Sequence, residues 1–166
     1  DITVTATFAL NEYTLTYTSG ANGSITGAAT QTVSHGSDGT AVTAVPDTGY
    51  HFVKWSDDVT TATRTDTSVT GDITVTATFA LNEYTLTYAA GANGSITGTA
   101  TQTVNHGSDG TAVTAVPNEG YHFVKWSDDI TTATRTDTSV TGDITVTATF
   151  ALNEYTLTYT AGANGS

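Results

Sequence analysis

The chain has 166 residues with 16 acidic and 4 basic side chains, a formal net charge of −12, and neither Cys nor Met. The lack of cysteine excludes a disulfide framework, a thiolate nucleophile and a Cys-ligated metal. With so few basic side chains no basic patch can form, so we expect neither nucleic acid nor an anionic membrane surface as a partner. No apolar run approaches the roughly 18 residues of a membrane span, so we expect no membrane insertion in this segment.

The composition favours a folded β protein. Charged residues make up 12% and hydrophobic residues 37% of the chain, both below the usual shares of about 25% and about 45–50%. Threonine is the most frequent residue and fills the gap. Thr, Val, Ile, Tyr and Phe favour pleated, half-buried surfaces, whereas acidic disordered chains are poor in β-branched and aromatic residues. The composition therefore predicts an all-β fold.

An internal repeat organises the whole chain. The segment DITVTATFALNEYTLTY begins at Asp1 and returns at Asp72 and at Asp143, so the repeat has a constant period of 71. This length suits a small domain, which buries only roughly 60% of its unfolded surface. Residues 1–71 and 72–142 differ at seven positions, none of them aromatic: Thr18/Ala89, Ser19/Ala90, Ala28/Thr99, Ser34/Asn105, Asp47/Asn118, Thr48/Glu119 and Val59/Ile130.

We place the domain boundaries so that each repeat begins and ends with a strand. Residues 11–81 then form repeat domain 1 and residues 82–152 form repeat domain 2. Residues 1–10 correspond to the last strand of a preceding repeat, and residues 153–166 to the first strand and turn of a following one. We therefore expect the polypeptide to continue through both ends with the same period.

The predicted strands of the first repeat begin with a clear alternation of apolar and polar residues. Tyr13, Leu15 and Tyr17 alternate with threonines, which is the period-2 pattern of a strand with one buried face. Asn22-Gly23 predicts a hairpin turn, because both residues tolerate positive φ. The segments that follow as predicted short strands are 24–27, 31–33 and 40–45, and Pro46 either stops the last of them or leaves it at a sheet edge.

The second half of the repeat contains its most apolar strands. Residues 50–55 form a predicted strand in which Phe52 and Trp55 are three residues apart. A flat strand would place them on opposite faces, so we expect a bulge near Val53-Lys54 to turn both inward. Residues 61–69 are polar on both faces and predict an edge strand, and residues 73–79 alternate most clearly of all. No segment has helical apolar spacing with a cap.

The joint between the repeats has no flexible composition. Residues 79–84 contain no Gly, Pro or Ser, whereas flexible linkers are rich in Gly and Ser and rigid spacers in Pro. The last strand of one repeat should therefore run almost directly into the first strand of the next. We expect stiffly coupled domains that form an extended rod.

The motif G-Y-x-F-x-x-W occurs at residues 49–55 and 120–126, between an opening Tyr-x-Leu strand and a closing strand that ends in Phe. With these features both repeats resemble the internalin-type B-repeats and their divergent relatives in bacterial surface proteins. The resemblance implies β-grasp-like domains strung in tandem on extracellular, cell-surface proteins, usually as a stalk. It implies no particular catalytic or binding residues.

Acidic loops raise the question of calcium. They offer hard oxygen ligands, but their spacing is neither that of an EF-hand nor that of a nonapeptide calcium repeat. Asp in turns is explained as well by hydrogen bonds from local backbone N–H groups to its side chain. We expect no cofactor and keep calcium as a weak alternative. Its candidate ligands are Asp38, Asp57 and Asp58 in the first repeat and Asp109, Asp128 and Asp129 in the second.

Other residue patterns suggest chemistry that the turns and the core explain more simply. A catalytic site at His35, Ser37 and Asp38 with His51 would need a nucleophile–base geometry that neighbouring turn residues rarely adopt. The sequon Asn-Gly-Ser permits glycosylation, but a turn explains Asn-Gly equally well. The remaining candidates are the sequons at Asn22, Asn93 and Asn164, covalent cross-links at Lys54 and Lys125, and a carbohydrate platform of Tyr13, Tyr17 and Trp55.

The sequence as a whole favours a structural role over catalysis. We expect a tandem-repeat segment that forms a stalk, spacer or fibre of an extracellular protein, and not an enzyme. Its partners would be neighbouring repeats and other copies in a fibre. Repeats 11–81 and 82–152 are both acidic, so neighbours should repel each other weakly. The alternative is an adhesin whose repeats bind glycan or protein through many weak copies.

Overall fold

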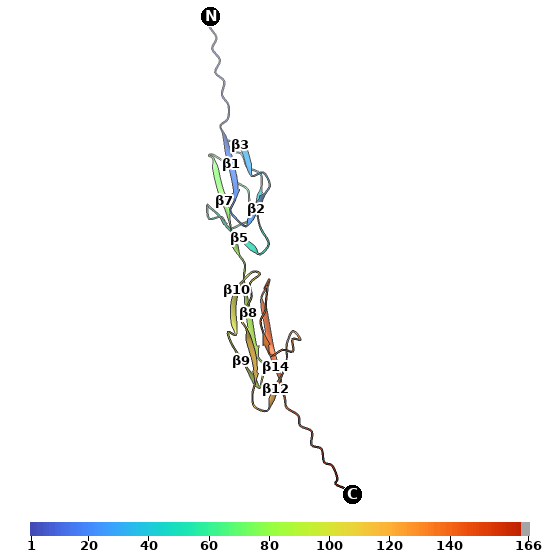
Figure 1. Cartoon of the computed structure of the whole chain (residues 1–166). Coiled ribbons are helices and arrows are strands. Elements are labelled where there is room, and N and C mark those ends of the chain that lie inside the picture. The colour runs from blue at the N-terminus through green and yellow to red at the C-terminus, as the bar shows by residue number, and fades with distance from the viewer. Residues whose placement is uncertain (164–166) are drawn as a thin grey trace. The chain divides into compact units, whose positions relative to one another are not determined.

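The computed structural model describes residues 1–163, which divide into two compact units, the first ending at Asn82 and the second beginning at Glu83 (Figure 1). All 14 elements of the described part are strands, which confirms the predicted all-β fold. Residues 1–163 contain no helix, and hence none long and apolar enough to cross a membrane.

Each unit contains seven strands in the same order. The first unit comprises β1 (Glu12–Ser19), β2 (Gly23–Thr26), β3 (Thr30–Ser34), β4 (Val42–Pro46), β5 (Tyr50–Trp55), β6 (Thr63–Arg64) and β7 (Ile73–Leu81). The second comprises β8 (Glu83–Ala90), β9 (Gly94–Thr97), β10 (Thr101–Asn105), β11 (Val113–Pro117), β12 (Tyr121–Trp126), β13 (Thr134–Arg135) and β14 (Ile144–Leu152).

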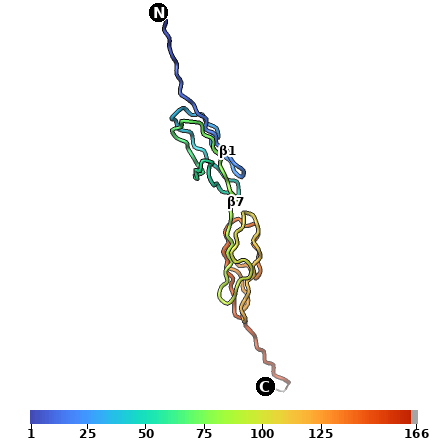
Figure 2. The backbone as a smooth tube through the Cα atoms, turned by 90° about the vertical axis from the view of Figure 1, so that its left-hand side faces the viewer, coloured from blue at the N-terminus to red at the C-terminus, as the bar shows by residue number. Residues whose placement is uncertain are grey.

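A mixed sheet of four strands forms the larger layer of each unit. Its order is β3-β1-β7-β5 in the first unit and β10-β8-β14-β12 in the second. The first and last strands of the unit are central and parallel, and the flanking strands are antiparallel to them. Figure 2 shows β1 and β7 within the backbone path of the first unit. The smaller layer is a sheet of three strands, β2-β4-β6 or β9-β11-β13.

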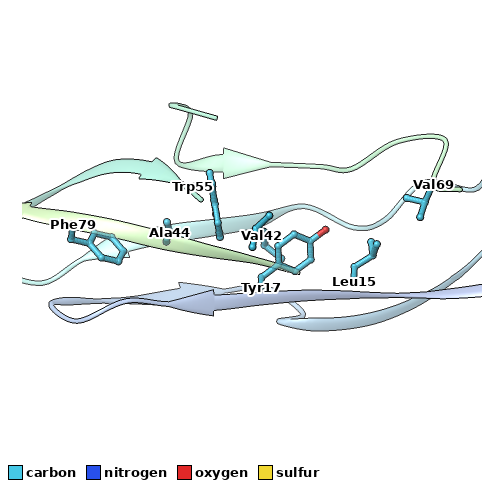
Figure 3. Packing of buried hydrophobic residues seen from close by; sticks show 9 residues of the cluster. Leu15, Tyr17, Val42, Ala44, Trp55, Val69 and Phe79 are labelled. Carbon is cyan, nitrogen blue, oxygen red and sulfur yellow. The ribbon is translucent and has the colours of Figure 1, made fainter. Parts of the chain in front are cut away.

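The hydrophobic core lies between the two sheets. The alternation in β1 and β7 points one face of each strand inward, where it meets β4 of the smaller sheet. Figure 3 shows these side chains between the two layers. The buried residues of the first core are Leu15, Tyr17, Val42, Ala44, Trp55, Val69, Val75, Ala77 and Phe79. Burying a side chain of Val to Phe size contributes about 1.5–3 kcal/mol.

The predicted bulge in β5 is confirmed. The register of β5 on β7 shifts between Phe52 and Lys54, so one extra residue is accommodated there. Trp55 is consequently fully buried. Its ring lies 5.9 Å from that of Phe52 and 6.1 Å from that of Tyr17, measured between centroids. Tilted and edge-on contacts of this kind are the arrangements that aromatic rings prefer.

The predicted hairpin around Asn22-Gly23 is wrong in its pairing. Asn22 does adopt a positive φ of 69°, but β1 pairs with β3 and β7 whereas β2 pairs with β4. The turn therefore carries the chain from one sheet to the other. Glycine is required at position 23 because a Cβ there would lie 2.4 Å from the ring of Phe79.

The predicted edge strand over residues 61–69 is much shorter than expected. Only Thr63–Arg64 forms a strand, β6, at the edge of the smaller sheet. Beyond it the chain turns at Ser68, where φ is 51° and the backbone N–H donates to Asp38 Oδ1 at 2.7 Å. The turn brings Val69 into the core, so this segment folds over the unit and does not extend along it.

The first and last described segments lie outside the sheets. Residues 1–11 and 153–163 form no strand, and Phe8 is 91% exposed although the equivalent Phe79 is buried. The sequence of residues 1–10 is identical to that of 72–81, so the difference comes from context: a lone strand has no neighbours to pair with. Their assignment to a preceding and a following repeat remains a prediction. Asn164 and the end of its turn lie outside the described residues.

Candidate functional site

The most elaborate polar arrangement of each unit is centred on its single arginine. Strand β6 places Arg64 opposite Val42 of β4, at the boundary of the core. Its side chain is only 7% exposed. The guanidinium Nη2 donates to Asp66 Oδ1 at 2.6 Å and Nε to Asp66 Oδ2 at 3.1 Å, while Nη1 donates to Asp57 at 3.0 Å. The pairing with Asp66 is therefore bidentate, which is the strong geometry for arginine and carboxylate.

Aromatic rings complete this arginine cluster, which we define as Tyr17, Trp55, Asp57, Arg64 and Asp66. The guanidinium carbon lies 5.3 Å from the Trp55 ring centroid and 5.8 Å from that of Tyr17, within the range of cation–π attraction. The Tyr17 hydroxyl donates to Asp66 Oδ2 at 2.7 Å. The second unit repeats the cluster with Tyr88, Trp126, Asp128, Arg135 and Asp137.

Electrostatics fix the charge states within the cluster. Burial opposes ionisation of Asp66, but hydrogen bonds from Arg64 and Tyr17 and the charge of the guanidinium outweigh it and lower the pKa of the carboxyl. Burial raises the pKa of the Tyr17 hydroxyl, and its hydrogen bond to Asp66 raises it further. Burial would lower the pKa of Arg64, but its two carboxylate partners raise it. The pair stays ionised and the tyrosine stays neutral.

The polar side chains of the arginine cluster bind one another. Within residues 1–163, every buried side-chain nitrogen and oxygen has a hydrogen-bond partner. A buried ion pair of this kind is costly to break, since removing one partner leaves an uncompensated charge. The arrangement can therefore hold the three segments 17, 55–57 and 64–66 together, which is a structural task.

The candidate calcium ligands already have other partners. Asp57 binds Arg64, Asp58 Oδ1 accepts from Lys54 Nζ at 2.7 Å, and Asp38 accepts from the backbone of Ser68. The equivalent contacts in the second unit are those of Asp128 with Arg135, Asp129 with Lys125 and Asp109 with Ser139. In the part of the chain that the structure describes, no three acidic or histidine side chains gather as a metal site would require. Calcium binding remains the weaker alternative.

Calcium should therefore leave the thermal stability of the protein nearly unchanged. The loop carboxylates would have to give up Arg64, Lys54 or a backbone N–H to bind the ion. The measurement is the melting temperature with and without millimolar calcium, with magnesium as the ionic-strength control. A rise of several degrees with calcium alone, reversed by a chelator, would contradict this expectation, because a ligand that binds only the folded state stabilises it.

Three residues of the possible catalytic site, His35, His51 and Asp38, contact three different partners. His35 Nδ1 contacts the Tyr13 hydroxyl at 3.3 Å, His51 Nδ1 contacts Asn82 Oδ1 at 2.9 Å, and Asp38 binds Ser68. No nucleophile–base–carboxylate chain joins them. The structure therefore gives a reason for each of these side chains that involves no catalysis.

The other sequence candidates also receive structural explanations. Tyr17 and Trp55 are 2% and 0% exposed, so the carbohydrate platform that would include them is wrong. Lys54 is half exposed and paired with Asp58, which is not the buried setting that a covalent cross-link needs. Asn22 lies exposed in its turn, and the turn accounts for the residue whether or not it carries glycan.

Sequence reasoning missed the arginine cluster. The sequence places Arg64 on a polar strand, and nothing local to it indicates burial. The available signal is that each repeat holds one arginine, two residues before an aspartate and nine residues after its only tryptophan. An arginine so placed in a charge-poor chain is a candidate for a buried pair.

Both units match one family model, described as the divergent InlB B-repeat domain, at residues 13–83 and 84–154. These two matches cover most of the chain, so the chain belongs to this family, as the resemblance implied. The matches begin two residues after the predicted boundaries at 11 and 82. B-repeat domains typically occur in bacterial surface proteins. Comparison with curated proteins and with solved structures found no similar chain.

Proposed function

We propose that the chain is a structural segment of an extracellular, cell-surface protein, in which the tandem repeats serve as a stalk or spacer. One observation carries this proposal: the chain enters each unit through one central strand and leaves through the other, and a single residue joins β7 to β8. Repeats connected in this way follow one another with almost no linker. The family to which both units belong supports the surface location.

The residue that follows the last strand of each unit is bound to that same unit. Asn82 donates its backbone N–H to the Gly49 carbonyl at 2.8 Å, and its side-chain oxygen contacts His51 Nδ1 at 2.9 Å. Asn153 makes the same contacts with Gly120 and His122, at 2.8 and 3.0 Å. Fixing this residue restricts the backbone at the point where the next repeat begins, which supports the expected stiffness of the joint.

The surface chemistry of the units also favours a spacer. The exposed positions of β1 and β7 are mainly threonines, which do not form a binding cluster. The adhesin alternative would be favoured by exposed aromatic side chains repeated in each unit. Within residues 11–152, the tryptophan, phenylalanine and most tyrosine side chains instead belong to the two cores or pack against them. The proposed partners are accordingly neighbouring repeats and other copies of the chain, and the proposed role is not catalytic.

Small-angle scattering of residues 11–152 tests the spacer proposal. A single compact globule of that length would have a radius of gyration of about 14 Å. If the repeats hold one another apart, both the radius of gyration and the maximum dimension should clearly exceed those of such a globule. Replacing Asn82 by a Gly-Ser linker should then broaden the distance distribution. A radius of gyration near the compact value would contradict the proposal.

A further inference from the structure

Tension along a tandem array would reach each unit at two defined points. In the first unit the chain enters at the start of β1 and leaves at the end of β7. These strands are parallel neighbours, with Leu15 opposite Ile73 and Ser19 opposite Ala77. The entry of β1 and the exit of β7 therefore lie at opposite ends of the strand pair, as the path in Figure 2 shows for this unit.

A load applied at these points would shear the two central strands past each other. The hydrogen bonds of a parallel ladder are evenly spaced along the strands. Because the force would act along the strands, all of these bonds would carry it at once and would have to break nearly together. If the force instead acted across the strands at one end, the bonds would break one after another. The first geometry resists a given force much longer than the second.

Further contacts reinforce the β1–β7 pair in the shear direction. Asp72 Oδ1 accepts from the backbone of Thr14 at 2.8 Å, before the ladder begins, and Gly20 donates to the Ala77 carbonyl at 2.9 Å, after it ends. Only glycine permits this second contact, since a Cβ at position 20 would lie 2.7 Å from that oxygen. In the second unit, Asp143 with Thr85 and Gly91 with Ala148 make the same contacts at 2.8 Å.

The core protects the ladder on one face. Leu15 and Tyr17 of β1 and Val75 and Ala77 of β7 are all buried in the same cluster. Water therefore reaches the paired strands only from the outer, threonine-bearing face. On that face of the first unit, the hydroxyls of Thr18 and Thr76 are 2.6 Å apart and Thr18 also donates to the Val75 carbonyl at 3.2 Å. The second unit lacks this bridge because Ala89 replaces Thr18.

From this geometry we infer that each unit is a load-bearing element, in which the parallel pairs β1–β7 and β8–β14 act as a clamp against tension applied along the chain. That such tension arises rests on the proposed role as a surface stalk; the clamp itself is a property of each unit. Its resistance is kinetic, because forced unfolding depends on the rate of unfolding and not on the equilibrium stability.

Single-molecule force spectroscopy on the 166-residue chain, held at its two ends, tests the clamp. Two unfolding events are expected, each extending one 71-residue repeat from its folded span to a contour length of about 240 Å, at about 3.4 Å per residue. The comparison uses handles at Asn11→Cys and Gly71→Cys, which are unique because the chain has no cysteine. A Cβ at position 71 meets no atom within 4 Å. These handles load the neighbouring starts of β1 and β7, so the strands should unzip at a severalfold lower force at the same loading rate.

Two pairs of matched substitutions distinguish the effect of the clamp on the unfolding force from the overall stability of the unit. Thr18→Ala gives the first unit the alanine that the second unit has at position 89, and it should lower the unfolding force of the first unit. Ala89→Thr makes the reverse change and should raise the unfolding force of the second unit. Val75→Ala in β7 and Val42→Ala in β4 remove the same buried groups, at 4% and 1% exposure. Their effects on urea stability should be similar, whereas Val75→Ala should lower the unfolding force more.

Equal unfolding forces for the two pairs of handles would overturn the clamp, as would an equal loss of force for Val42→Ala and Val75→Ala. Either result would leave the spacer proposal standing, because that proposal depends on the scattering of residues 11–152. A compact scattering profile together with direction-dependent unfolding forces would overturn the spacer and retain the clamp.

Discussion

Replacement of Trp55 by alanine should remove much of the stability of the first unit and leave that of the second unit unchanged. Trp55 is completely buried, contacts Tyr17 and Phe52, and lies under the guanidinium of Arg64. Its indole Nε1 also donates to the Thr61 carbonyl at 3.1 Å. Truncating a buried tryptophan costs about 3–5 kcal/mol. A unit of this size has a total stability of only about 4–10 kcal/mol at the usual value per residue.

The near-identity of the units makes this prediction specific. In the Trp55→Ala variant, Trp126 is the only tryptophan left, so its fluorescence reports urea unfolding of the second unit alone. Amide hydrogen exchange in peptides that contain Thr18 or Asp47, where the repeats differ, reports the first unit. We expect rapid exchange in the first unit and an unchanged urea midpoint for the second.

The mirror variant Trp126→Ala should reverse the result, with Trp55 as the remaining reporter. Val53→Ala is the control, because Val53 lies on the same strand as Trp55 but is 37% exposed. This substitution should change the stability of the first unit little. Loss of protection in both units after a single substitution would show that the units depend on each other for folding. Retained protection in the first unit of Trp55→Ala would show that its core is less dependent on the indole than the packing indicates.

The strands could be predicted from the sequence because their signals are local. Tyr13, Leu15 and Tyr17 alternate with threonine whatever the partner strand is, and the spacing of Phe52 and Trp55 required a bulge. The pairing could not be predicted in the same way. Asn22-Gly23 indicated a local hairpin. Strand β1 instead pairs with β7 to bury its apolar face, and β2 to β6 lie between these two strands in the chain. Non-local pairing of this kind depends on the closure of the core.

The arginine cluster shows the same limit for a site. Tyr17 and Asp66 are far apart in the sequence and meet only because β1 and the loop after β6 cover the same end of the core. In the sequence Arg64 stands among threonines, and its surroundings indicate a solvated strand. The catalytic hypothesis started from His35, Ser37 and Asp38, which are close in the sequence, and the carbohydrate-binding hypothesis started from residue type alone. The structure assigns those residues to turns and to the core.

The stability of each unit should depend on pH through Asp66 and its counterpart Asp137. The folded state lowers the pKa of both carboxyls, because the guanidinium and the tyrosine hydroxyl outweigh the effect of burial. A group with a depressed pKa contributes stability above the pKa of the unfolded chain, about 3.9 for Asp. This contribution is lost as the pH falls below that value and through the folded pKa. We therefore expect a loss of stability below about pH 4.

The double variant Asp66→Asn/Asp137→Asn should be less stable than the wild type near pH 7, by about 2 kcal/mol in each unit, the usual cost of losing a hydrogen bond to a charged group. Asparagine keeps an oxygen for the tyrosine hydroxyl but provides no charge for the arginine, whose other partner, Asp57 or Asp128, is 40% or 38% exposed. The arginine is then left with a single, partly solvated carboxylate. Changing both units keeps their transitions together, so that one tryptophan signal can follow them.

Urea unfolding of the wild type and the double variant, measured from pH 7 down to pH 2, provides the test. The difference between their free energies of unfolding should shrink as the pH falls, because protonation of Asp66 and Asp137 removes the same charge that the substitution removes. Asp47→Asn is the matched control, since it introduces the residue that the second unit already has at position 118, and it should leave the pH profile unchanged. A difference that stays constant down to pH 2 would mean that the aspartates act through packing and neutral hydrogen bonds, and the ionic basis of the cluster would be wrong.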